Sequence, residues 1–177
     1  MILPVLLTAL VCSSRCPAAL VLPAYDLASA LRDHGVAVVS GFHTPIERDC
    51  LHFLLKGTQP VVVCPARSTE RMRIPPEWRE AVAAGRLHVV SPFGPEQRRA
   101  TAALAAARNQ FVAELATAAV IIHAAPGSRT ERWCSNTLAS GKPVFALDAP
   151  ENALLFESGA RRFTMADLLA ELGAPQS

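Results

Sequence analysis

The sequence predicts an α/β protein with a doubly wound, mostly parallel, Rossmann-like sheet of about five to seven strands and helices on both faces. Short apolar runs rich in β-branched residues recur along the chain, and most are continuous rather than alternating. Continuous runs are typical of strands buried on both faces of a parallel sheet. Amphipathic helical stretches and short polar loops separate these runs, as in a chain that alternates strand and helix.

The individual elements follow from these patterns. The expected strands are residues 3–11, 36–39, 61–64, 87–90, 120–123 and 144–147. The expected helices are residues 23–34, 44–56, 76–84, 95–118, 130–140 and 166–172. Several of these helices end at a glycine, a common helix C-cap, and Pro45 lies in a first-turn position. The chain shows no repeat or linker, so we expect residues 1–177 to form a single domain.

Composition excludes several classes of protein. With 51% hydrophobic and 18% charged residues, the chain is not disordered, collagen-like or a coiled coil. The formal net charge of +2 neither requires nor excludes a nucleic-acid partner. No apolar run approaches the roughly 20 residues of a membrane span, so we expect no membrane partner. Residues 1–11 lack the charged start and the cleavage site of a signal peptide and are interpreted as a buried strand.

The five cysteines predict free thiols. They are widely spaced, form no C-x-x-C pair, and are accompanied by scattered histidines rather than by paired metal ligands. Free thiols suit the reducing cytoplasm, where we expect the protein to act. We assign no metal and no cofactor.

The loops that follow the strands are the candidate site, because ligands of such sheets bind beyond the carboxyl ends of the strands. Three of these loops carry an arginine beside hydroxyl groups: Arg15, Arg67 and Arg129. Hydroxyl and backbone N–H groups donate hydrogen bonds to phosphate oxygens, and arginine adds a bidentate contact. Each loop alone could be an ordinary turn or helix cap. Three arginine-bearing loops at one sheet edge favour a phosphate-bearing ligand.

Motifs of the common nucleotide enzymes and hydrolases are absent. The sequence contains no G-x-G-x-x-G, no P-loop and no G-x-S-x-G elbow. Glu47, Glu131 and Asp148 are the carboxylates near the loops, and none lies in a recognised motif. His123 is expected to be a hydrogen-bonded residue at a strand end, whereas His43 lies in a candidate ligand loop. We assign no catalytic residue and leave open whether the protein is an enzyme.

Residues 108–115 (RNQFVAEL) resemble the R-N-R-I-I-A-G-L segment of the DprA/Smf family of DNA-processing proteins. Further stretches resemble that family in the same order: residues 38–41 (VVSG), 61–67, 128–130, 141–146 (GKPVFA) and 158–160. The resemblance therefore extends from about residue 3 to about residue 160. Arg129 departs from the pattern, because the family has a glycine there, and the loop at residues 42–45 lacks the family's basic residue.

The resemblance implies an extended Rossmann fold that binds single-stranded DNA without catalysis, forms a homodimer and assists a RecA-type recombinase during DNA uptake. The residues expected to contact phosphate or DNA are Ser14, Arg15, Ser40, Gly41, Arg67, Ser68, Arg108, Asn109, Gly127, Ser128, Arg129 and Thr130. Arg108 and Asn109 lie inside an expected helix, and the resemblance favours a position facing the pocket. The alternative is that Arg108 pairs with Glu114 or with another surface acid.

Two other functions stay open. Residues 126–130 are a shortened form of the P-G-G-x-G-T-x-x-E motif of LOG-type phosphoribohydrolases, with Trp133 in place of the catalytic glutamate. The protein could thus be a nucleotide sensor or a nucleotide-processing enzyme with an N-glycosidic hydrolase-like activity. It could also be a structural dimer partner with a degenerate pocket. DNA binding favours a basic path with stacking aromatics, for which Phe42, Phe93 and Trp133 are the candidates.

Overall fold

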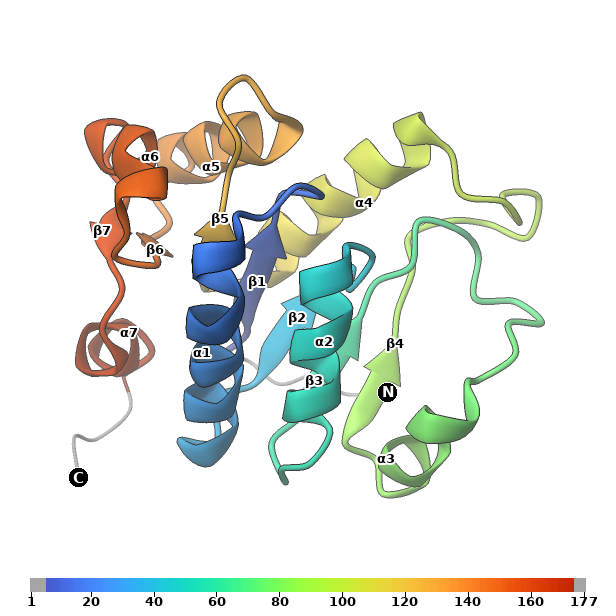
Figure 1. The fold of residues 1–177 in the computed structure, drawn as a ribbon. Coiled ribbons are helices and arrows are strands. Elements are labelled where there is room, and N and C mark those ends of the chain that lie inside the picture. The colour runs from blue at the N-terminus through green and yellow to red at the C-terminus, as the bar shows by residue number, and fades with distance from the viewer. Residues whose placement is uncertain (1–5, 174–177) are drawn as a thin grey trace.

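The computed structural model describes residues 6–173, and its strands form one seven-stranded sheet (Figure 1). The strands are β1 (Thr8–Cys12), β2 (Val38–Ser40), β3 (Val61–Val63), β4 (Leu87–Val89), β5 (Ala118–His123), β6 (Val144–Ala146) and β7 (Arg161–Arg162). They lie in the order β4-β3-β2-β1-β5-β6-β7, and every neighbouring pair is parallel. The doubly wound α/β prediction is confirmed.

Helices cover both faces of the sheet. They are α1 (Val21–Asp33), α2 (Pro45–Leu54), α3 (Arg79–Ala83), α4 (Ala102–Leu115), α5 (Arg129–Ala139), α6 (Ala153–Glu157) and α7 (Met165–Glu171). Short 3-10 turns precede α1, α3 and α6, at Ala18–Leu20, Pro76–Trp78 and Pro150–Asn152. Buried side chains of α1, α2, α3 and α7 form the core on one face, and those of α4, α5 and α6 form the core on the other. No helix within residues 6–173 is long and apolar enough to cross a membrane.

The continuous apolar runs are explained by this two-sided burial. In β5 all six residues are buried, with Val120 and Ile122 in one core and Ala119 and Ile121 in the other. Because successive strand side chains point to opposite faces, a strand between two helical layers needs an apolar residue at every position.

The structure corrects several expected boundaries. The helix expected at residues 95–118 begins only at Ala102, where the Thr101 side chain accepts a hydrogen bond from the Leu104 N–H and caps the first turn. It ends at Leu115, because Ala116 is extended and leads into β5. Part of the first expected strand, residues 3–5, lies outside the described residues.

Two elements of the structure, β7 and α6, were not predicted from the sequence. β7 has two residues, both exposed, so it carries no apolar run that a sequence pattern could detect. α6 has five residues and follows a 3-10 turn, which is too short to show a helical period. Both complete the β7 edge of the sheet.

The strand order places a switch point between β1 and β5. From β1 the chain moves outward through β2 and β3 to β4, then returns through α4 to place β5 against the other side of β1. The helix after β1 covers one face and the helix after β5 covers the other. The two loops therefore diverge and open a crevice at the carboxyl ends of these strands, where ligands of doubly wound sheets bind.

Candidate functional site

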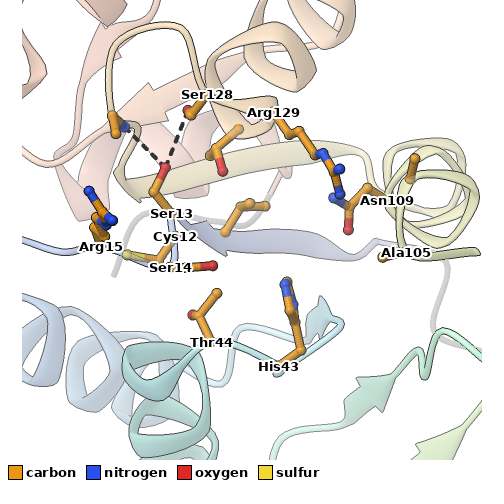
Figure 2. Close-up of a pocket in the computed structure, with 14 residues that line it drawn as sticks. Cys12, Ser13, Ser14, Arg15, His43, Thr44, Ala105, Asn109, Ser128 and Arg129 are labelled. Atoms are coloured by element: carbon orange, nitrogen blue, oxygen red, sulfur yellow. Dashed lines mark hydrogen bonds between the residues drawn. The ribbon is translucent and has the colours of Figure 1, made fainter. Parts of the chain in front are cut away.

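A pocket of about 360 Å³ occupies this crevice (Figure 2). Its walls come from the loops after β1, β2 and β5, from the first residues of α5 and from α4. Its polar side chains are those of Ser13, Ser14, Arg15, His43, Thr44, Asn109, Ser128, Arg129 and Thr130. Arg15 and Arg129 enter it from opposite sides, and no Asp or Glu is among the residues that line it in the described part of the chain (Figure 2).

A hydroxyl pair joins the two loops of the switch point. Ser13 Oγ donates to Ser128 Oγ over 3.3 Å and accepts from the Ala125 N–H at 3.0 Å. Ser128 Oγ also accepts from the Glu131 N–H at 3.2 Å, as the N-cap of α5. Because Ser128 Oγ accepts both of these bonds, its own proton is left to donate into the pocket.

Arg108 lies beneath the pocket rather than in its wall. The residue is 1% exposed, and its guanidinium donates through Nη1 to the Cys64 carbonyl at 2.9 Å and through Nε to Asn109 Oδ1 at 2.8 Å. Nη2 lies 2.9 Å from His43 Nδ1. Burial lowers the pKa of Arg108, while the nearby Glu47 carboxylate opposes that shift. Arg108 thus acts on the pocket by orienting His43 and Asn109, and it forms no ion pair with Glu114.

Gly41 is required by this arrangement. A Cβ atom at residue 41 would lie 1.8 Å from Nη1 of Arg108, closer than any real contact. The glycine of the VVSG loop and the arginine of the RNQ segment therefore form one structural unit, although 67 positions separate them in the sequence.

Glu47 is a buried carboxylate that holds the floor of the pocket together. Oε1 accepts from the Cys12 N–H at 3.0 Å, and Oε2 accepts from the N–H groups of His43 and Thr44 at 2.9 and 3.2 Å. Thr44 Oγ1 accepts in turn from the Glu47 N–H, which completes a capping box at the start of α2. Burial alone would raise the pKa of Glu47, but His43 and these N–H groups outweigh it and hold that pKa below its ordinary value.

The other two carboxylates near the loops are also engaged. Glu131 accepts from the Gly127 N–H at 2.7 Å, and Asp148 pairs with Arg162. Neither these two residues nor Glu47 lines the pocket. A general acid or base would have to come from another side chain.

The two histidines of interest differ in role. His43 lines the pocket with about half of its side chain exposed, and its Nδ1 lies between Arg108 Nη2 and Glu47 Oε2, the latter at 3.1 Å. Since a guanidinium can only donate, Nδ1 accepts whenever the bond to Arg108 forms. His123 is buried, with Nδ1 3.1 Å from Asn152 Oδ1, which confirms the expected hydrogen-bonded strand-end histidine.

Apart from Arg108, which lies beneath the pocket, the expected site residues divide into four groups. Ser14, Arg15, Asn109, Ser128, Arg129 and Thr130 line the pocket. Ser40 and Gly41 line a void of about 10 Å³ that also touches His43 and Asn109. Gly127 lies at the start of the α5 loop, and its N–H is bound to Glu131.

Arg67 and Ser68 form the fourth group, in a separate hollow of about 270 Å³. Of the four expected arginines, Arg15 and Arg129 therefore share one pocket. Arg108 supports that pocket from below, and Arg67 lies apart.

Some features of the site were not expected. Thr44 lines the pocket, and the sequence signal for it was the T-x-x-E capping box at residues 44–47. The aromatic candidates do not serve as stacking platforms in this pocket. Phe42 and Trp133 are buried in the two cores, and Phe93 is not among the residues that line the pocket.

Residues 4–172 match the family model described as DNA recombination-mediator protein A. The chain belongs to this family. The match confirms the DprA resemblance and covers almost the whole sequence. No curated protein matches the chain.

Solved structures of the family share the fold. DNA processing protein A from Streptococcus pneumoniae superposes with a TM-score of 0.74 at 18% identity, over 93% of this chain and 60% of that one. The protein from Helicobacter pylori, studied for its single-stranded DNA binding mode, gives 0.73 at 18% identity, over 95% of this chain and 80% of that one. This chain thus spans less than two thirds of the length of the streptococcal relative.

The same fold carries a different function elsewhere. The molybdenum cofactor carrier protein from Chlamydomonas reinhardtii superposes with a TM-score of 0.67 at 14% identity, over 95% of this chain and 99% of that one. DNA-processing and cofactor-carrier proteins share this fold, so the fold alone does not identify a ligand. The residues of the pocket are the evidence for one.

Proposed function

We propose that this protein binds single-stranded DNA, without catalysing a reaction on it, by holding a backbone phosphate in the pocket at the carboxyl ends of β1 and β5. The observation that carries the proposal is the placement of Arg15 and Arg129 on opposite sides of a pocket that no carboxylate lines. Membership of the DNA recombination-mediator family supports the same choice of ligand.

The chemistry of the pocket suits a phosphodiester. Two guanidinium groups can each offer paired N–H donors to phosphate oxygens, and such charge-assisted bonds are about twice as strong as neutral ones. Ser128 and Thr130 add hydroxyl groups at the start of α5, where the helix dipole also favours an anion. The absence of a lining carboxylate removes the repulsion that a phosphate would otherwise meet.

The test is a fluorescence anisotropy titration of a labelled dT20 oligonucleotide at several salt concentrations. Contacts from Arg15 and Arg129 should contribute about −1.4 to the log–log salt slope, at about −0.7 for each phosphate contact. The variants Arg15→Gln and Arg129→Gln should each weaken binding and reduce the slope. Arg32→Gln is the control, because Arg32 lies in the last turn of α1, and Figure 1 shows that α1 ends near the amino ends of the strands, away from the pocket.

Arg129 offers a sharper form of this test, because the family has a glycine at its position. If Arg129 clamps the ligand, Arg129→Gly should lose about 1.5–3 kcal/mol of binding free energy, the range of a hydrogen bond to a charged group. Tighter binding by the variant would mean that the arginine fills the space of the ligand. A wild-type protein with no affinity for dT20 at low salt would reject DNA as the ligand and favour a nucleotide. No affinity for either ligand would indicate a degenerate pocket in a structural dimer partner.

A nucleotide is the second candidate ligand, and the size of the pocket favours it. A volume of about 360 Å³ falls within the range of about 300–1,000 Å³ that small-molecule sites occupy. Calorimetric titration with a nucleoside monophosphate and with dT20 distinguishes the two ligands. An N-glycosidic hydrolase has less support, because Glu47 and Glu131 are both bound to backbone N–H groups.

Three further properties are proposed from the family resemblance. The protein forms a homodimer, assists a RecA-type recombinase on the bound strand, and acts in the cytoplasm, where its five free thiols would stay reduced. Light scattering after size-exclusion chromatography tests the dimer. Recombinase filament assembly on protein-coated single strands tests the second property.

A further inference from the structure

We infer that the hollow formed by the loops after β3 and β4 is a second anion site, in which Arg67, Arg71 and Arg98 hold a phosphate of the same single strand that occupies the switch-point pocket. This inference rests on the proposed function and extends it from one phosphate to a path. The three arginines line a volume of about 270 Å³ together with Ser68, Glu70 and Met72.

The backbone around this hollow is held in place by hydrogen bonds between its two loops. The Ser68 N–H donates to the Gln97 carbonyl at 2.7 Å, and Ser91 Oγ donates to the Arg67 carbonyl at 2.7 Å. Gln97 Oε1 accepts from the Gly94 N–H at 2.8 Å, which closes the second loop on itself. The arginines are therefore presented by a preorganised frame, which reduces the ordering cost of binding.

The charge in the hollow is not neutralised. Within residues 6–173, none of Arg67, Arg71 and Arg98 forms a salt bridge, although Glu70 lines the same hollow. All three arginines are exposed, and the Nε of Arg98 donates to the Pro95 carbonyl at 3.1 Å, a bond that does not use its two terminal amino groups. Three cations against one carboxylate give a local excess of positive charge that suits a phosphate.

The backbone of Arg71 supports the same conclusion. Its φ of +58° lies in the left-handed region, which a residue with a long side chain rarely adopts. Such conformations persist where the surrounding structure imposes them and gather at ligand sites. Here the turn places a third guanidinium against the hollow.

The hollow and the pocket lie along one edge of the sheet. In the order β4-β3-β2-β1, β3 is two strands from β1, so a strand spacing of about 4.8 Å puts the carboxyl ends of these two strands about 10 Å apart. The loop that carries Arg98 runs directly into α4, whose Ala105 and Ala106 line the pocket. Figure 1 shows both loops projecting beyond β3 and β4, next to the start of α4. A mononucleotide could not reach both sites, whereas an extended single strand could.

The experiment compares a short and a long probe, fluorescein-labelled dT2 and dT20, on three proteins. The wild type, the hollow variant Arg67→Gln/Arg98→Gln and the pocket variant Arg15→Gln/Arg129→Gln are titrated at several salt concentrations. The hollow variant should bind dT20 about tenfold or more weakly, with a salt slope smaller by about 1.4. It should bind dT2 as the wild type does, because the single phosphodiester of dT2 can occupy only one site. The pocket variant should lose affinity for both probes.

The outcomes separate the two proposals. If the hollow variant binds dT20 with unchanged affinity and slope and the pocket variant binds it more weakly, the second anion site is refuted and the proposed function stands. If only the hollow variant is weakened, the second site stands and the pocket assignment is wrong. A wild type that binds neither probe overturns both. Thermal unfolding of each variant checks the fold, and Arg71→Gln repeats the test with a third side chain that lines the same hollow.

Discussion

At the scale of single residues, the pocket is shaped by two buried charged side chains that do not line it. Arg108 and Glu47 lie under the pocket, and each is held by backbone groups of loops that are distant in the sequence. Their side chains set the positions of His43, Thr44 and Asn109, which do line the pocket. The sequence predicted Arg108 as a phosphate contact and Glu47 as a carboxylate near the loops. In the structure both act as positioning residues.

The close approach of Gly41 to Arg108 gives a prediction about stability. Gly41→Ala should lower the free energy of unfolding by about 2–4 kcal/mol, because the added Cβ displaces the guanidinium and leaves the Cys64 carbonyl without its donor. Urea unfolding measures the loss. In an Arg108→Ala background the same change should cost much less, and an equal cost in both backgrounds would contradict the assigned contact.

Glu47 predicts a pH dependence of stability. Its pKa is lowered in the folded protein, so ionised Glu47 stabilises the fold above its unfolded pKa of about 4.3, and this contribution is lost as the pH falls through the lower folded value. Glu47→Gln should therefore cost about 2–3 kcal/mol at pH 7 and less below pH 4. The test is denaturant unfolding of the wild type and of Glu47→Gln from pH 7 to below pH 4. The other carboxylates are present in both proteins, so the difference between the two reports Glu47. A difference that does not vary with pH would mean that Glu47 is not charged in the folded state.

At the scale of elements, α4 is the helix whose ends the sequence placed least well. The residues before and after α4 also favour a helix by composition. The capping residue Thr101 and the extended Ala116 set where the helix begins and ends. Thr101 caps the first turn, and the last turn contains no basic residue of its own. Lys142, from the loop before β6, supplies the missing cation by donating to the carbonyl groups of Ala113 and Ala116 at 2.6 and 2.7 Å.

This contact predicts a specific role for one of the two lysines in the chain. Lys142→Met should destabilise the protein by about 1–2 kcal/mol, because unpaired carbonyl groups and the helix dipole lose their cation. Lys56→Met is the control, since Lys56 is exposed and lies over the Phe53 ring, a contact worth about 0.5–1 kcal/mol at an exposed site. In thermal and urea unfolding, Lys142→Met should lose more stability than Lys56→Met. A larger loss in Lys56→Met would refute the capping role of Lys142.

At the scale of the whole molecule, the two cores enclose most of the thiols. Four of the five cysteines are buried, and Cys16 is partly exposed. Burial raises the pKa of Cys50 and Cys64 to about 12 and that of Cys134 to about 11, so these thiols are protonated at neutral pH.

The thiols should therefore report global unfolding. With a thiol reagent at pH 8, Cys16 should react first, and the other four should react only as fast as the protein unfolds. Mass spectrometry of peptides taken during the reaction identifies each site. Fast modification of Cys64 in the native protein would show that the loop after β3 opens independently of the core.

The class of the fold, the family and the loops around the pocket could all be predicted from the order of the residues. Strands buried on both faces appear in the sequence as continuous apolar runs, and several helices end at a glycine. Both are local patterns that can be recognised from residues adjacent in the sequence. Tertiary structure decided which loops share a pocket. The strand order brings the loops of Arg15 and Arg129 together at the switch point and places Arg67 two strands away, with Arg71 and Arg98. It also buried Arg108 against Gly41, because contacts across 67 positions depend on how strands are ordered, which local patterns do not encode.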